Sequence, residues 1–148
     1  MARELALQTL YSAEMTGNST DQVLKDVSGW RRYTPEAMTY AAALATSVQK
    51  NRNECNQLIQ ETVEHWEFSR IALLDRIILQ MGICELLFSE DVPPRVVIDE
   101  AIELAKKYST KKAGGFINGV LDTILKKRRP HYAQGKKGDP IGGENERR

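Results

Sequence analysis

Residues 106–116 carry the side chains best suited to bind a phosphate and a base. This segment combines lysines, adjacent glycines and an aromatic ring, namely Lys106, Lys107, Lys111, Lys112, Gly114, Gly115 and Phe116. Ammonium groups neutralise phosphates, and glycine lets backbone N–H groups approach an anion closely. We expect the last helix to follow Gly115, so that its positive dipole end adds to the attraction. A ring beside such a site could stack on a splayed base of single-stranded RNA.

Phe116 has a competing interpretation as a core residue. It shares a row with Val120 and Ile124 at helical spacing, on the apolar face of the expected last helix. On spacing alone the core position is favoured. In that case the glycine pair is simply a flexible loop that precedes the helix.

Residues that could perform covalent or metal chemistry form no recognisable constellation. The chain contains no His-Glu-x-x-His pattern, phosphate loop or dinucleotide fingerprint, and His65 and His131 lie far apart. Cys55 and Cys84 match no metal spacing, and each falls in an apolar helical stretch. We therefore expect buried free thiols in a reducing compartment. The sequence indicates a binding protein with no catalytic residues, metal or cofactor.

The charges are distributed unevenly along the chain. Residues 36–104 carry twelve acidic and five basic residues, whereas residues 105–148 carry twelve basic and four acidic ones. A basic C-terminal part favours an acidic partner such as nucleic acid, although a solvated lysine-rich surface would look the same. The N-terminus does not resemble a signal peptide, and no apolar run is long enough to cross a bilayer. We expect a cytoplasmic protein with no membrane contact.

Helical periodicity dominates the first half of the chain. An amphipathic helix is expected over residues 3–15, and a second short one after a Ser19 or Thr20 cap. Thr34-Pro35-Glu36 is a strong helix start. The following stretch, 36–66, predicts one long helix or two nearly collinear ones that meet near Arg52, where the apolar stripe is broken.

The second half predicts three more helices and a tail. Residues 70–88, with Ser69 as a possible cap, are apolar around most of the circumference, which is typical of a central helix. Pro93-Pro94 forces a turn and opens the next helix. We predict an all-α fold of six or seven helices over residues 1–127, followed by a basic, disordered tail over residues 128–148.

Four stretches together resemble the NusB family of transcription antitermination factors. They are RELALQTLY, RIALLDRIILQMGICELLF, VPPRVVIDEAIELAKKY and FINGVLDTIL, which occur in the family's order and span residues 3–127. The third matches Pro-x-x-Val-x-Ile-Asn-Glu-Ala-x-Glu-Leu-Ala-Lys, and the fourth matches Phe-Val-Asn-Gly-Val-Leu-Asp. These last two patterns are the most specific.

The resemblance implies a fold and a function. Family members are seven-helix proteins built as two small bundles, and they bind the boxA element of nascent ribosomal transcripts. They do so with NusE, a small-subunit ribosomal protein, in a complex with NusA, NusG and RNA polymerase that reads through terminators. Some members form homodimers and others are monomers. The fold also occurs as a domain of an rRNA cytosine methyltransferase, for which this chain has no room.

The resemblance also implies roles for particular residues. Arg3 matches the last arginine of an N-terminal cluster that touches RNA, and Phe116 matches an aromatic that contacts RNA. The resemblance thus favours an RNA contact for Phe116 over a purely core position. Tyr11 matches a tyrosine at the NusE interface, and Asp75 and Arg76 match an acid–base pair that faces NusE.

The chain departs from the family pattern at several positions. It offers Arg3 alone where many members have several consecutive arginines, which should weaken phosphate binding unless the segment 106–112 or the run Lys126–Arg129 compensates. Lys112 replaces an acidic or polar residue, and Gly115 replaces a commonly basic or polar one. For Asn118 and Gly119 we expect structural roles, respectively a side-chain bond to the backbone and close helix packing.

Two other functions compete with RNA-binding antitermination. A protein–protein adaptor with weakened RNA binding would fit the short N-terminus. A detached methyltransferase subunit would need a partner that supplies the cofactor site.

Overall fold

The computed structural model describes residues 1–29, 32–64 and 68–131, and within these ranges it contains α-helices, one short 3-10 helix and no strand. The seven α-helices are α1 (Ala2–Thr16), α2 (Thr20–Ser28), α3 (Pro35–Lys50), α4 (Arg52–Thr62), α5 (Leu73–Phe88), α6 (Pro94–Tyr108) and α7 (Lys111–Arg128). The prediction of an all-α fold is confirmed. His65 and residues 132–148 of the expected tail lie outside the described residues.

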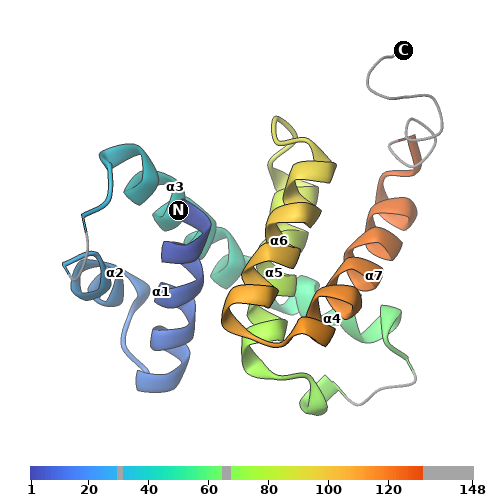
Figure 1. Ribbon diagram of the computed structural model, residues 1–148, viewed down its shortest axis with the longest axis horizontal. Helices are drawn as coiled ribbons and strands as arrows, with labels where there is room; N and C mark the ends of the chain where they lie inside the picture. The colour runs from blue at the N-terminus through green and yellow to red at the C-terminus, as the bar shows by residue number, and fades with distance from the viewer. Residues whose placement is uncertain (30–31, 65–67, 132–148) are drawn as a thin grey trace.

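Helices α1, α2 and α3 form one small bundle, and α4 to α7 form the other (Figure 1). Helix α5 joins the two, because it contacts α1 and α3 as well as α4, α6 and α7. Every residue from Ile77 to Leu86 is buried, as the nearly uniform apolarity of this segment predicts. The central helix thus fixes the position of the first bundle relative to the second.

Two of the expected caps are present and one is not. Ser19 Oγ accepts a hydrogen bond from Gln22 N, and Thr34 Oγ1 accepts one from Ala37 N. Ser69 does not cap α5, because it lies in the 3-10 helix Phe68–Arg70. Helix α5 instead begins at Leu73 without a side-chain cap.

The long helical stretch after Thr34 is divided into two helices at Asn51. The backbone N–H of Asn51 donates to the Ser47 carbonyl at 3.0 Å, and its side-chain amide donates to the same oxygen at 2.8 Å. The side chain thereby occupies the last turn of α3, and α4 starts at Arg52. This is the two-helix alternative that the sequence left open.

The start of the last helix differs from the sequence expectation. Helix α7 begins at Lys111, where Thr110 Oγ1 accepts a hydrogen bond from Ala113 N at 3.1 Å. The glycine pair therefore lies inside the helix rather than before it. Gly114 is buried and faces α6, where a Cβ placed on it would lie 3.4 Å from Ile102.

The end of α7 also reaches beyond the expected boundary at residue 127. The helix continues to Arg128, and the side chain of Arg129 is 11 % exposed. Its guanidinium donates to the Leu86 carbonyl at 2.7 Å, at the end of α5. Residues 128 and 129 thus belong to the folded part of the chain.

The two cysteines are buried free thiols, as predicted. Cys55 on α4 and Cys84 on α5 face each other with 3.7 Å between their sulfur atoms. The hydrogen bond to Cys84, followed by burial, raises the pKa of Cys55. Among the helices of the described ranges, none combines the length and the apolarity that a bilayer span requires.

Candidate nucleic-acid interface

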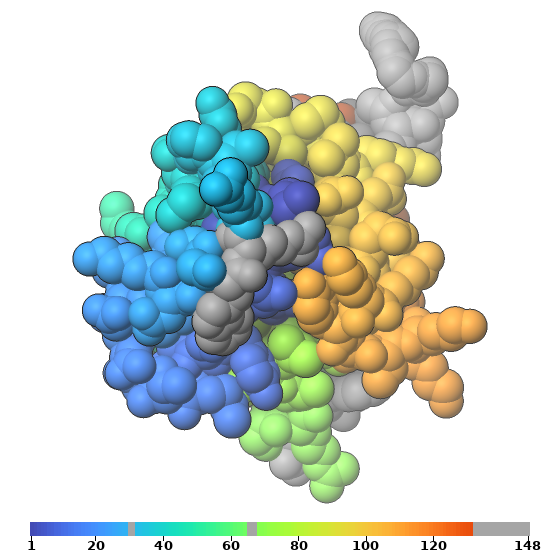
Figure 2. Space-filling model, turned by 60° about the vertical axis from the view of Figure 1, so that its left-hand side comes forward, coloured from blue at the N-terminus to red at the C-terminus, as the bar shows by residue number. Residues whose placement is uncertain are grey.

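The basic residues predicted to touch RNA lie at the start of α1, the end of α6 and the start of α7. Arg3, Lys106 and Lys107 line one surface pocket of about 370 Å³ between α1 and α6. Figure 2 shows the dark-blue start of α1 at the surface between cyan α3 and yellow-orange α6. The structure therefore brings together basic residues that are about a hundred positions apart in the sequence.

The guanidinium of Arg3 is occupied by a buried carboxylate. Its Nε and Nη2 donate to the two carboxylate oxygens of Glu85, both at 2.8 Å. The Arg3 side chain is 18 % exposed and that of Glu85 only 2 %. Such a bidentate pair is strong and geometrically specific. Arg3 therefore attaches α1 to α5, and only its Nη1 edge approaches the pocket, 3.7 Å from Glu100.

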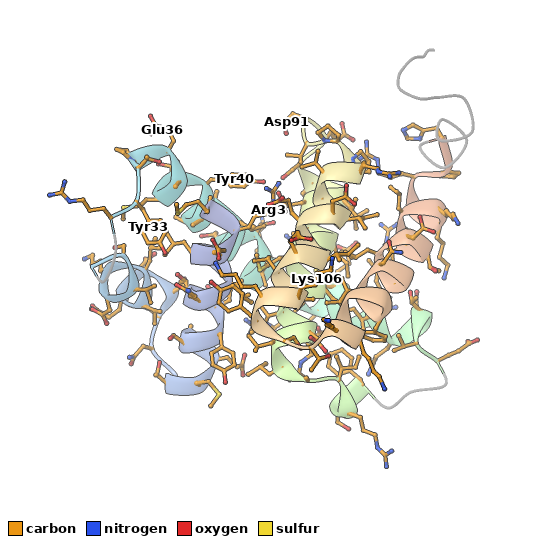
Figure 3. The ribbon with its side chains drawn as sticks, in the orientation of Figure 1. Arg3, Tyr33, Glu36, Tyr40, Asp91 and Lys106 are labelled. Carbon is orange, nitrogen blue, oxygen red and sulfur yellow. The ribbon has the colours of Figure 1, made fainter. Side chains whose placement is uncertain are left out.

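Tyr40 of α3 completes this network. Its hydroxyl donates to Glu85, and the Arg3 guanidinium lies 5.5 Å from the centre of its ring (Figure 3). Burial and the hydrogen bond to Glu85 raise the pKa of Tyr40 to about 12. The phenol therefore stays protonated and can donate throughout the neutral range.

Lys107 is held by a second carboxylate. The ammonium group donates to Glu4 of α1, and the Tyr108 hydroxyl donates to the same oxygen at 2.9 Å. The hydrogen bond from Lys107 keeps the pKa of Glu4 below its usual value, against the opposing effect of burial. Lys106 is less constrained, because within the described residues it pairs only with Glu103, an exposed carboxylate one turn earlier at 3.5 Å.

Lys111 and Lys112 are the predicted basic residues that remain unpaired within the described part of the chain. Both are exposed and occupy the first turn of α7. In Figure 2, the orange atoms of this part of the chain protrude from the surface. The positive end of the helix dipole lies at the same place. A phosphate can therefore reach two unpaired ammonium groups in this region of the described surface.

The glycine pair plays a different part from the one expected. Gly115 lies beyond the four N–H groups that a helix start leaves free, so its N–H group belongs to the helix interior. Gly114 is buried against α6. Gly115 is exposed, and a Cβ placed there would touch nothing within 4 Å. A ligand can therefore approach the helix backbone closely at Gly115.

Phe116 is both a core residue and a surface residue. It is partly buried and packs against the hydrophobic core. It also lines a shallow surface pocket of about 340 Å³ between the end of α4 and α7, together with Gly115 and Gly119. The two interpretations of the sequence are thus compatible, since the ring has one side in the core and another toward this pocket.

The structural roles expected for Asn118 and Gly119 are wrong. Both residues are exposed, and a Cβ at Gly119 would meet nothing within 4 Å, so this glycine does not permit close packing of helices. Within the described residues the Asn118 side chain makes no hydrogen bond to backbone. It lines another surface pocket, with Arg95 and Asp122.

The residues predicted to face a protein partner lie on α1 and α5, which pack against each other. Tyr11 is half-buried on α1. Asp75 lies in the first turn of α5, and its Oδ1 is buried and accepts no hydrogen bond from the described residues. The Arg76 guanidinium lies 5.1 Å from the centre of the Phe68 ring. The structure thus leaves at least one hydrogen-bond acceptor unused on these helices.

Sequence reasoning missed the carboxylates that hold the basic residues. Glu85 was visible as one of few charges on a helix that is otherwise apolar, and a buried carboxylate requires a partner. That signal could have identified an ion pair, although not Arg3 as the second member. Glu4 and Tyr40 gave no comparable signal, because charged and aromatic residues are common on the polar face of an amphipathic helix.

Comparisons with known proteins agree with this architecture. The model of the NusB family matches residues 1–126. The chain is 42 % identical over 125 residues to transcription antitermination protein NusB of Salinibacter ruber, covering 84 % of this chain and 78 % of the relative. It is 37 % identical over 128 residues to NusB of Myxococcus xanthus, covering 82 % of this chain and 90 % of the relative.

Solved structures show the same fold. One is NusB of T. maritima, with a TM-score of 0.79, 30 % identity, and coverage of 90 % of this chain and 95 % of that one. Another is a complex of antitermination factors NusB and NusE with double-stranded RNA. The matched chain has a TM-score of 0.77 and 30 % identity, and the match covers 85 % of this chain and 94 % of that one. On the family match and these identities, the chain belongs to the NusB family.

Proposed function

We propose that this chain binds boxA-type RNA of nascent ribosomal transcripts together with NusE and thereby supports transcription antitermination. The observation that carries the proposal is that Lys111 and Lys112, which form no ion pair within the described residues, lie on the same helix as the partly exposed ring of Phe116. Cations and an aromatic ring in one place suit single-stranded RNA, which offers phosphates and unstacked bases. A relative of similar fold has been solved with NusE and RNA.

In this proposal the basic residues have unequal roles. Lys111 and Lys112 contact phosphates directly, and Lys106 joins them after leaving its exposed pair with Glu103. Lys107 must exchange Glu4 for a phosphate. Arg3 mainly positions the start of α1, because its carboxylate partner Glu85 is buried.

Phe116 contacts a base at the surface pocket beside Gly115. The absence of a side chain at Gly115 lets the RNA backbone lie against α7, and the N–H group of Gly115, which belongs to the helix interior, takes no part. Binding is non-enzymatic and requires no metal or cofactor.

The face of α1 and α5 that bears Tyr11, Asp75 and Arg76 docks NusE. A change of the Asp75 side chain on docking would bring its buried Oδ1 to a donor of that partner, which removes the cost of a buried acceptor left without a donor. The heterodimer then joins NusA, NusG and RNA polymerase in the cytoplasm. RNA and NusE each bind one face, so their contributions to holding the transcript combine.

The experiment is titration of labelled boxA RNA with the wild type and Phe116→Ala, each with and without NusE. We expect Phe116→Ala to weaken RNA binding roughly tenfold, as for loss of one stacked base. Circular dichroism controls for the fold, because the ring also touches the core. An unchanged affinity of a folded Phe116→Ala protein would refute the base contact.

The adaptor function is the second candidate, and a specific observation favours it. Two of the predicted RNA contacts, Arg3 and Lys107, are held by Glu85 and Glu4. An adaptor would bind NusE and yet fail to shift boxA RNA in a gel, with or without NusE. RNA-binding antitermination predicts a shift that becomes stronger when NusE is added.

A further inference from the structure

A second polar pocket lies between α1, α4 and α5, apart from the lysine-rich surface. Its volume is about 190 Å³, and its polar lining consists of Glu14, Arg52, Asn56, Arg76 and Gln80. Four of these five side chains carry N–H donors. Arg52 is the residue that interrupts the apolar stripe between α3 and α4, and the contacts proposed above give it no role.

Of the two arginines in the pocket, Arg52 forms one long ion pair and Arg76 forms none within the described ranges. Arg52 Nη1 lies 3.7 Å from Glu14, which is beyond hydrogen-bond distance. Arg76 stacks at 5.1 Å from the Phe68 ring and makes no ion pair within the described ranges. Both guanidinium groups therefore retain donors that a planar acceptor could use in a bidentate manner.

The amides in this pocket are fixed in an orientation that adds another donor. Gln80 is 4 % exposed, and its Nε2 donates to Asn56 Oδ1 at 2.7 Å. Because Asn56 accepts this bond through its oxygen, the Nδ2 group of Asn56 remains available to donate to a ligand. No described residue accepts a hydrogen bond from that nitrogen.

The start of α5 adds positive potential at the same place, whereas the start of α4 adjoins the end of α3, which has the opposite dipole. Arg52 is the first residue of α4, and Leu73 and Arg76 lie in the first turn of α5. Neither helix has a side-chain cap, so the N–H groups of both first turns lack that partner. The guanidinium groups, the amide and the start of α5 together favour a negatively charged group in this pocket.

We propose that this pocket receives an acidic side chain of the protein partner that docks on α1 and α5, with Arg52 and Arg76 binding its carboxylate. The proposal rests on the proposed docking of NusE, and it adds Arg52 and Asn56 to that interface. Tyr11 and Glu14 are one turn apart on α1, and Arg76 belongs both to the predicted docking face and to the lining of the pocket, so the pocket continues that face.

An RNA phosphate is the less suitable occupant. The rim already carries the carboxylate of Glu14, and Asp75 lies next to Arg76 in the sequence. These charges repel each further phosphate of a polyanion, whereas a single carboxylate meets that repulsion once and can be bound by the two arginines and the amide. The pocket therefore favours one protein carboxylate over a stretch of nucleic acid.

The test is calorimetric titration of NusE into the full chain and its variants. We expect Arg52→Glu to weaken NusE binding by roughly tenfold or more, and Arg52→Ala to weaken it less. Arg95→Glu on α6 is the matched control, since it makes the same charge change at an exposed site outside the pocket. A lysine substitution of one surface acid of NusE should restore binding to Arg52→Glu, and circular dichroism checks each fold.

The outcomes separate this inference from the proposed function. If Tyr11→Ala weakens NusE binding and both Arg52 variants bind like the wild type, the pocket is not part of the interface and the inference fails alone. If Tyr11→Ala and Asp75→Ala also bind normally, the docking face itself is wrong. If Arg52→Glu weakens boxA binding in the absence of NusE while NusE binding is normal, the pocket is an RNA site and the inference is overturned.

Discussion

The Arg3 guanidinium donates two hydrogen bonds of 2.8 Å to the carboxylate of Glu85, 82 residues away in the chain. This bond joins the first turn of α1 to the central helix of the fold. A residue that the family resemblance assigns to RNA contact thus has a structural partner. If Arg3 mainly contacts RNA, its substitution should weaken RNA binding. If Arg3 mainly holds Glu85, its substitution should lower the stability of the fold.

We expect Arg3→Ala to lower the free energy of unfolding by about 3 kcal/mol, because removal of one member leaves the other charge buried and unpaired. Denaturant unfolding measures the loss. The control is Arg95→Ala, which removes an exposed pair with Asp99 and should change stability by less than about 0.5 kcal/mol. Equal stability of both variants would mean that the Glu85 pair does not hold α1 in place.

Tyr40 makes folding stability depend on alkaline pH. Its pKa is about 12 in the folded chain, against 10.0 for an ordinary tyrosine. Between these values the unfolded chain has lost the proton and the folded chain has kept it. The stabilising contribution is therefore complete below pH 10 and is lost as the pH rises to 12.

Comparison of the wild type with Tyr40→Phe measures this contribution. The difference between their unfolding free energies should shrink across that pH window, because phenylalanine has no proton to lose. Absorbance titration should also show one late-ionising phenol in the wild type that the variant lacks. A constant difference in stability across the window would contradict the assignment.

Much of the fold could be predicted because its signals are local. The Thr34 cap, the apolar turns of α5 and the Pro93-Pro94 turn each depend on residues within a few positions. The start of α7 could not be predicted from the glycine pair. Glycine costs about 1 kcal/mol in a helix interior, but the Thr110 cap and the packing of Gly114 on Ile102 outweigh that local preference.

The candidate site was predictable only in part, for the same reason. Residue type identified the lysines and Phe116, which share one short segment. The pairing of Arg3 with Glu85, and of Lys107 with Glu4, joins residues 82 and 103 positions apart. Such pairs depend on how α1 packs across α5 and α6, and no periodicity within one helix encodes that arrangement.

Gly82 and Gly119 should respond in opposite ways to alanine. A Cβ at Gly82 would lie 2.8 Å from Leu121 Cδ1, in a fully buried contact between α5 and α7. Overpacking of this kind costs about 1–3 kcal/mol, which exceeds the gain in helix propensity. Gly119→Ala meets nothing within 4 Å and should stabilise the protein by about 0.5–1 kcal/mol. Thermal unfolding compares the two, and stabilisation by both substitutions would show that α5 and α7 are less closely packed.

Glu4→Gln should strengthen RNA binding by roughly threefold, the size of a typical surface ion pair. Glutamine can still accept a hydrogen bond, but it no longer competes with a phosphate for the charge of Lys107. The measurement is the affinity for boxA RNA at one fixed salt concentration. Glu103→Gln, which frees Lys106 from an exposed pair, provides the comparison. Weaker RNA binding by Glu4→Gln would mean that Lys107 stabilises α1 rather than contacting RNA.

Lys111 and Lys112 should account for a measurable part of the salt dependence of RNA binding. Each phosphate contact to single-stranded nucleic acid contributes about 0.7 to the slope of log affinity against log salt. Replacing both lysines by glutamine should therefore reduce the slope by about 1.4 and weaken binding at low salt.

The control for these lysines is the double replacement of Lys126 and Lys127 by glutamine at the other end of α7. It removes the same charge, but Lys126 is paired with Asp122 at 2.9 Å. The neighbouring arginines are also engaged, since Arg128 lies 3.4 Å from Glu54 and Arg129 bonds to Leu86. If the control reduces the slope as much as the Lys111 and Lys112 variant does, the effect reflects net charge, and the start of α7 is not where the phosphates bind.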